Sequence, residues 1–147
     1  MKSLHAAAAR EEFAARIAKL TPAAVPRWGK MSAPEMVVHL ADALRMATGD
    51  LAVRSKKVPV RFPPLKQLLI YVIPFPKGLP TAPELRSRAP SAWDGEVDDL
   101  VAMLEQFGQR DSAKPWPAHP VFGTMSRTDW GVLAYRHTDH HLRQFNV

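Results

Sequence analysis

The chain has 147 residues, 46% of them hydrophobic and 23% charged, a composition that predicts one ordinary globular domain over residues 1–147. It contains no cysteine, which excludes disulfide bonds, metal sites with thiolate ligands and a cysteine nucleophile. The net charge of +6 is spread along the chain, so we interpret it as a solvated surface and expect no nucleic-acid partner; the densest basic group is Arg54, Lys56, Lys57 and Arg61.

The first segment of the chain is rich in alanine and predicts a helix over Leu4–Leu20. Phe13, Ile17 and Leu20 recur at helical spacing, and Pro22 stops the helix. The apolar run in this segment is only four alanines long, which is too short for a signal peptide. No window approaches the roughly 20 apolar residues of a membrane span. We therefore expect a cytoplasmic protein that does not engage a membrane.

A second helix is predicted for the stretch "SAPEMVVHLADALRMATG", which begins at Ser32. Ser32 and Glu35 have the spacing of a capping box, in which each side chain binds the other residue's backbone N–H. Pro34 falls in the first turn, where its missing N–H costs nothing. Gly49 supplies the stop, because glycine readily adopts the left-handed conformation that ends a helix.

Residues 50–90 contain eight prolines and are predicted to be largely irregular. Their one apolar run, "LKQLLIYVI" over Leu65–Ile73, suits either a short helix or a buried strand, since periodicity does not separate the two at this length. Core packing is the favoured role for this run. An interfacial segment or a dimer contact is the alternative.

The last two predicted helices follow the proline-rich segment. Ser91 is the candidate cap of a third long helix, which has apolar residues at helical spacing as far as Phe107 and ends at Gly108. Ser126, with an acidic residue in the following turn, starts a last helix that continues to about Phe145. Four helices without a convincing set of strands predict an all-α fold, a four-helix bundle with a long proline-rich crossover between the second and third helices.

Three of the six histidines lie within five positions of the last helix, in "HTDHH". At about 100° per residue, His137 and His141 share the apolar sector that contains Trp130 and Leu133, so both point toward the interior. His140 lies on the opposite flank, toward charged side chains. A spacing of four residues lets two imidazoles on one helix face share a metal ion. Hydrogen bonds can also satisfy two inward histidines without any metal, and both interpretations stay open.

His39, at the edge of the apolar sector of the second helix, is the candidate third ligand. Glu35 and Asp42 share this edge, either as groups that orient His39, as a general base, or as plain surface carboxylates. His119, in "HPVFG" before the last helix, is a candidate proton shuttle or a loop-packing residue. Three histidine ligands leave coordination positions for water or substrate, which is typical of a catalytic metal site.

The strings "MSAPEMVVHLADAL", "HPVFGTMS" and "HTDHHLRQF", together with Trp130, resemble the DinB/YfiT-like metalloenzyme superfamily, and within it a subfamily with HPxFG and HxxHHLRQF strings. The resemblance extends from the first helix to the last. It implies a four-helix bundle and a metal site with one histidine from the second helix and two, four residues apart, from the last. His39, His137 and His141 match these positions.

The resemblance also implies a divalent transition metal, nickel or zinc, with water completing its shell. It implies a small-molecule substrate, a homodimer, and a thiol-dependent S-transferase, isomerase or hydrolase activity, the first with a low-molecular-weight thiol as co-substrate. A cation held by neutral imidazoles keeps its full charge and can lower the pKa of a bound water or thiol. The alternative function is a non-catalytic helical-bundle dimer or binding module with an empty histidine cluster.

Overall fold

The computed structural model describes residues 1–56, 58–77 and 81–147, so Lys57 of the basic group and residues 78–80 lie outside the described residues. Within the described part every regular element is a helix, which confirms the predicted all-α class. The long helices are α1 (Ala7–Ile17), α2 (Ala33–Thr48), α4 (Trp93–Gln109) and α5 (Arg127–Gln144). The crossover between α2 and α4 carries four short ones, η1 (Pro59–Arg61), α3 (Leu65–Gln67), η2 (Leu68–Val72) and η3 (Pro83–Arg86). None of the described helices is both long enough and apolar enough to cross a membrane.

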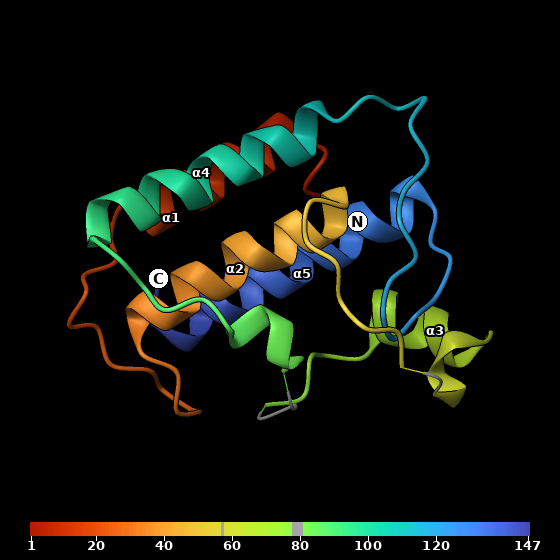
Figure 1. The fold of residues 1–147 in the computed structure, drawn as a ribbon, viewed down its shortest axis with the longest axis horizontal. Coiled ribbons are helices and arrows are strands. Elements are labelled where there is room, and N and C mark those ends of the chain that lie inside the picture. Colours follow the sequence, from red (N-terminus) through yellow and green to blue (C-terminus); the bar gives the residue numbers. More distant parts are fainter. Residues whose placement is uncertain (57, 78–80) are drawn as a thin grey trace.

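The long helices pack in two layers around one apolar core. α2 contacts both α4 and α5, and α1 contacts the same two helices, with α1 and α4 above α2 and α5 in Figure 1. The core between them is continuous and includes Phe13, Leu40, Leu104 and Trp130, each at most 2% exposed. Burial of one such side chain contributes about 1.5–3 kcal/mol, so this core is the main source of stability.

Capping boxes fix the starts of α2 and α5, which confirms the box predicted at Ser32 and the cap predicted at Ser126. Ser32 and Glu35 bind each other's backbone N–H at the start of α2. At the start of α5 the Ser126 N–H donates to Asp129 at 2.9 Å, and the Asp129 N–H donates to the Ser126 hydroxyl at 3.1 Å. α2 ends at Gly49, whose φ of 92° is the left-handed conformation expected there. Both ends of α2 are therefore where the sequence places them.

Two helix starts differ from the prediction. α1 begins at Ala7 rather than Leu4, because the Leu4 N–H donates to the carbonyl of Gly131 in α5 at 2.9 Å. α4 begins without a side-chain cap, because the Ser91 hydroxyl donates to the Glu96 carboxylate at 2.8 Å instead. α4 also continues one residue past the predicted stop at Gly108.

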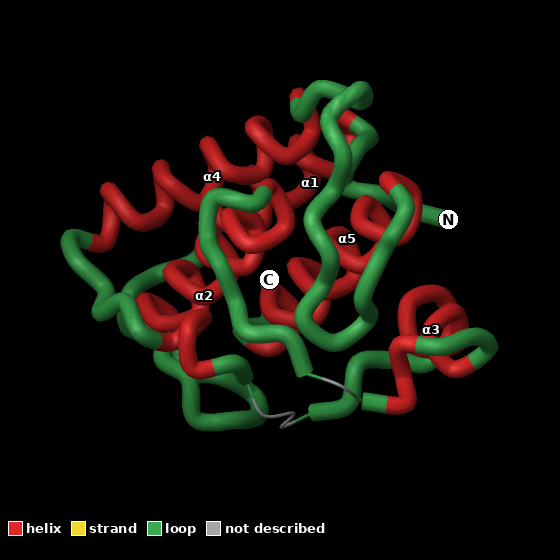
Figure 2. The backbone as a smooth tube through the Cα atoms, turned by 45° about the vertical axis from the view of Figure 1, so that its right-hand side comes forward, coloured by secondary structure: helices red, strands yellow, loops and turns green. Residues whose placement is uncertain are grey.

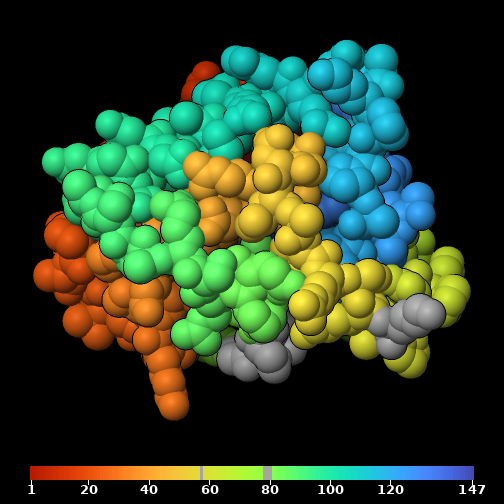
Figure 3. Space-filling model, in the orientation of Figure 1, coloured from red at the N-terminus to blue at the C-terminus, as the bar shows by residue number. Residues whose placement is uncertain are grey.

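The crossover segment Leu65–Ile73 is helical, and its predicted core role is wrong for most of its side chains. Ile70 is fully buried, whereas Leu68 and Val72 are 40% and 65% exposed. The segment projects from the long helices near the label α3 in Figure 2, so only one narrow side of it reaches the core. In the space-filling view the crossover, yellow to light green, runs across the lower part of the molecule (Figure 3).

The capping box of α5 provides a stability test. We expect Ser126→Ala to lower the free energy of unfolding by about 1 kcal/mol, because one N–H of the first turn loses its acceptor. Thr128→Ala, at an exposed position in the same turn, is the matched control and should stay within about 0.5 kcal/mol of the parent. Urea unfolding, monitored by circular dichroism, measures the free energy of unfolding of each variant. Equal decreases of this free energy in the two variants would contradict the capping role.

Candidate metal centre

Three histidines from two helices converge between α2 and α5. His39 comes from the middle of α2, and His137 and His141 come from successive turns of α5. Their ring nitrogens offer three ligand atoms that lie within 4.8 Å of one another, and the Nε2 atoms of His39 and His137 are 3.2 Å apart. The three ring centroids are 4.8–5.0 Å apart. The structure thus brings together the three residues that the sequence singled out.

Hydrogen bonds on the outer side of the cluster fix two of the rings. The Nδ1 of His39 lies 3.3 Å from the carbonyl oxygen of Leu85, and the Nδ1 of His141 lies 2.9 Å from Oε1 of Gln144. Gln144 presents this oxygen because its Nε2 donates to the carbonyl of Trp28 at 2.7 Å. Both acceptors are oxygens without a proton to give, so each Nδ1 carries the hydrogen. His39 and His141 therefore carry on Nε2 the lone pairs that can bind an ion.

Burial keeps the cluster neutral. It lowers the pKa of His39, lowers that of His141 to about 3 and lowers that of His137 well below its ordinary value. The neighbouring histidines lower the pKa of His137 and of His141 further, because each imidazolium would repel the next. All three rings are therefore uncharged near neutral pH, which is the form that binds a metal.

The donor set fits a first-row divalent ion. Metal–nitrogen bonds of about 2.0–2.1 Å place two imidazole nitrogens of one shell roughly 3–3.4 Å apart, and the observed separation of 3.2 Å falls in this range. The donors are all neutral nitrogens, which suit zinc, nickel, copper and iron better than calcium or magnesium. Three ligands from the chain leave room for a small molecule in the coordination shell.

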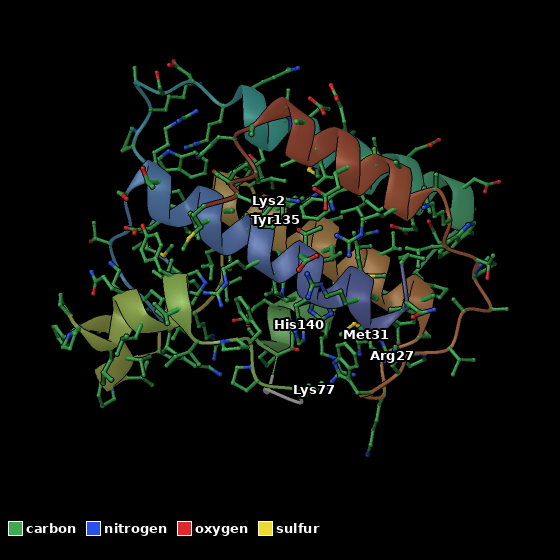
Figure 4. All side chains as sticks on the ribbon, turned by 180° about the vertical axis from the view of Figure 1, so that it is seen from behind. Lys2, Arg27, Met31, Lys77, Tyr135 and His140 are labelled. Carbon is green, nitrogen blue, oxygen red and sulfur yellow. The ribbon has the colours of Figure 1, made fainter. Side chains whose placement is uncertain are left out.

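The histidines line a cavity of about 320 Å³ that opens to the surface. Trp28, Met31 and Phe75 form apolar parts of its wall, and no carboxylate occurs among the described residues that line it. His140 lies at its rim, where its ring packs against Trp28 and Phe75 at centroid distances of 5.6 and 5.9 Å. Figure 4 shows His140 at the end of α5 with Met31 beside it. The predicted separation of His140 from the inward pair is therefore correct.

The family assignment agrees with this arrangement. The DinB superfamily model matches residues 5–145, which is nearly the whole chain.

The chain belongs to the DinB superfamily.

Proteins of this superfamily are in general metal-binding, and the resemblance noted in the sequence is confirmed at the level of the family. Comparisons with curated proteins and with solved structures gave no match. The family assignment therefore rests on the family model together with the histidine cluster, and it does not specify a reaction.

The carboxylates predicted to assist the DinB cluster are bound elsewhere. Glu35 closes the capping box, and hydrogen bonds from Ser32 lower the pKa of its carboxyl group. Asp42 accepts hydrogen bonds from Arg45 at 2.8 Å and from Arg88 at 3.3 Å. Neither residue lines the cavity of the histidines. The structure thus does not bring these two candidates to the site.

His119 does line the cavity, in a tight turn closed by mutual backbone hydrogen bonds between His119 and Gly123. Its Nδ1 accepts hydrogen bonds from the backbone N–H groups of Val121 and Phe122, both at 3.1 Å. The neutral ring therefore carries its hydrogen on Nε2. Burial, assisted by the charge of Lys66, lowers the pKa of His119 to about 4, so the ring is a neutral hydrogen-bond donor at pH 7.

Sequence reasoning identified the three histidines but missed part of their surroundings. Helical periodicity places Gln144 near the direction of His137, and in the structure its amide reaches His141. The carbonyl of Leu85 and the ring of Phe75 come from the crossover, and no pattern in that segment indicates them. They reach the site through tertiary packing alone.

His119 provides a test of the electrostatics. Its pKa is lower in the folded chain than its ordinary value of 6.5, so the unfolded chain binds more protons between about pH 4 and 6.5. The free energy of unfolding therefore falls as the pH decreases through this range. His119→Asn keeps an acceptor for the two N–H groups but does not titrate. We expect it to lose about 1–2 kcal/mol less than the parent between about pH 7 and pH 5.

The measurement is urea unfolding of the metal-free protein at several pH values. Because both chains share every other titratable group, the difference between their pH profiles reports His119 alone. Parallel profiles would contradict the assignment of a buried, neutral His119.

Proposed function

We propose that this protein is a divalent-metal-dependent enzyme with His39, His137 and His141 as the metal ligands. The observation that carries the proposal is the orientation of the cluster: neutral imidazoles converge, and outer hydrogen bonds turn the Nε2 lone pairs of His39 and His141 inward. A purely structural cluster does not require an adjoining cavity, whereas a catalytic site does. Zinc and nickel are the ions that the resemblance favours.

When bound, the ion supplies Lewis acidity, which favours the deprotonated form of a water or thiol near neutral pH. The chain has no cysteine, so a thiol would come from a small co-substrate. We propose either a thiol-dependent S-transferase or a hydrolase acting on a small molecule. The all-nitrogen donor set suits both reactions.

Other residues of the cavity have roles that follow from their protonation. His119 presents its Nε2–H and can donate a hydrogen bond to a polar group of the substrate. His140 is half-buried at the rim and contacts the ring of His141 at 5.2 Å between centroids. Partial burial lowers the pKa of His140 below its ordinary value, so the ring is neutral near pH 7 and can accept a proton at the cavity mouth.

One observation also favours the alternative of an empty cluster in a non-catalytic module. The separation of 3.2 Å between the Nε2 atoms of His39 and His137 also fits a hydrogen bond, with His137 as the donor. Such a bond would satisfy the pair without a metal. The two functions differ in metal content, which makes elemental analysis the deciding measurement.

We expect protein purified without an affinity tag to contain, or to bind on addition, about one divalent ion per chain. His137→Ala should abolish this binding, since it removes one of three ligands. His140→Ala is the matched control, because it removes a neighbouring imidazole that is not among the three, and it should leave the metal content unchanged. Elemental analysis by mass spectrometry and titration with nickel, zinc, manganese and iron measure the result.

Two results would reject the enzyme proposal. One is a parent protein that binds none of the four ions. The other is a His137→Ala variant that binds them as well as the parent does. A loss of stability in His137→Ala without any metal dependence would support the non-catalytic alternative.

Gln144 provides a second test, through the orientation of His141. We expect Gln144→Ala to weaken metal binding by about 10–100-fold, because the His141 ring loses the acceptor that fixes its tautomer. Gln144→Glu keeps an acceptor at this position and should recover most of the affinity. Arg143→Ala, at the exposed neighbouring position, is the control. Competition with a metal chelator measures the affinities, and equal values for Ala and Glu at 144 would contradict the orienting role.

A further inference from the structure

A second cavity of about 230 Å³ lies directly beside the histidine cavity, between α2 and α5. Its walls are almost wholly apolar and include Leu40, Ala43 and Leu44 of α2 and Leu133 and Ala134 of α5. The two cavities share several lining residues and therefore adjoin; the shared side chains are Met46, Phe75, Leu85, His119, Val121 and His137. All three proposed ligands thus line the outer cavity, and His137 lines the inner cavity as well.

The size and polarity of the inner cavity limit what can enter it. Apolar cavities of about 150 Å³ accept one benzene ring, so 230 Å³ accommodates one ring or a short branched hydrocarbon. Its polar lining consists of His119, His137 and Thr138 among the described residues. A charged group would lose its hydration there with few partners, whereas an apolar group would gain the free energy of leaving water.

The outer cavity is cationic at its opening. Lys30 and Arg86 line it, both are exposed, and neither forms an ion pair with a carboxylate in the described part of the chain. Lys77 extends the positive region, since its ammonium group lies 4.4 Å from the ring centre of Trp28, which also lines the cavity. Glu35 is near enough for Arg86 to lower its pKa, but Ser32 already binds that carboxylate.

We propose that the site takes a small anionic molecule that carries one compact apolar group, an aromatic ring or a short branched chain. The apolar group occupies the inner cavity between α2 and α5, and the anionic group faces Lys30 and Arg86 at the opening. This order places the middle of the molecule beside His119 and the three-histidine cluster. The inference rests on the proposed function only for the reaction at the middle of the bound molecule. Binding of the anion depends on the two cavities and on the charges of Lys30 and Arg86.

The charges also argue against other small molecules. A cation would meet Lys30, Arg86 and a bound divalent ion, without a carboxylate in the lining to compensate. A fully polar metabolite would leave the inner cavity without a suitable occupant. A neutral hydrocarbon would fill the inner cavity but make no use of the cationic opening. Only an anion with an apolar end uses both features.

Three probe molecules separate these contributions. 3-Phenylpropanoate has both features, 3-phenylpropan-1-ol has the ring alone, and propanoate has the anion alone. We expect 3-phenylpropanoate to bind untagged protein at least about fivefold more tightly than the alcohol, and propanoate not to bind measurably. Calorimetric titration of the protein before and after removal of metal by a chelator shows whether the preference depends on the ion.

Two variants test the role of the inner cavity. Ala134→Leu fills the inner cavity without replacing any of the three histidines and should weaken 3-phenylpropanoate binding at least about tenfold. Ala43→Leu fills it from α2 and serves as an independent test should the first variant not fold. Ala102→Leu, on the exposed face of α4, is the control for both.

The double variant Lys30→Gln and Arg86→Gln should reduce the preference for the anion over the alcohol, with Lys77 as the remaining cation, while the alcohol binds as before. Arg27→Gln combined with Lys19→Gln removes the same charge outside the cavity and is the control. A parent that binds the alcohol or propanoate as well as 3-phenylpropanoate would overturn the inference, as would filled variants with unchanged affinity.

Metal content, measured on the same samples, keeps the two proposals distinguishable. Anion binding by a parent protein that neither contains a divalent ion nor binds one on addition would support this inference and reject the proposed enzyme. Metal binding without a preference for 3-phenylpropanoate would reject this inference and leave the proposed enzyme standing.

Discussion

The site depends on one constraint: three imidazoles must stay neutral, and near one another, in the interior between two helices. Burial makes them neutral, and fixed partners orient two of them. The relative placement of α2 and α5 brings the three rings together, because a shift of one turn, about 5.4 Å, would separate His39 from the pair on α5. Complete capping boxes define the first turn of both helices, and the core holds them side by side.

The crossover between α2 and α4 takes part in the site as well as connecting two helices. Arg88, just after η3, binds Glu96 of α4 at 2.8 Å and Asp42 of α2 at 3.3 Å. This anchoring places η3 against α2, where the carbonyl of Leu85 meets His39. Near its middle the crossover is held to α5 by Arg136, which donates to the carbonyl of Leu69 at 3.0 Å. Two helices supply the three histidines, but contacts with the crossover also set the orientation of their rings.

This division explains how much the sequence could predict. The helices, the caps of α2 and α5 and the inward direction of His137 and His141 depend on neighbours within four residues, so periodicity was sufficient for them. The cap predicted at Ser91 was wrong, because the Ser91 hydroxyl donates to Glu96 instead. The joining of His39 to this pair was predicted with help from the family resemblance, and convergence in space confirms it. Asp42 shows what periodicity does not contain: besides Arg45, three residues on, it binds Arg88, which lies 46 residues away. The exposed side chains of Leu65–Ile73 failed as core candidates for the same reason, since their surroundings are set by distant segments.

No carboxylate occurs among the described residues that line the histidine cavity, and this bears on whether folding requires a bound metal ion. Clusters of acidic ligands repel one another until a cation arrives, and small thiolate sites often leave the chain unfolded without it. Three uncharged rings impose no such repulsion, and the apolar core is complete around them. Folding and the proposed metal binding are therefore separable steps: the chain can fold first and bind a divalent ion afterwards.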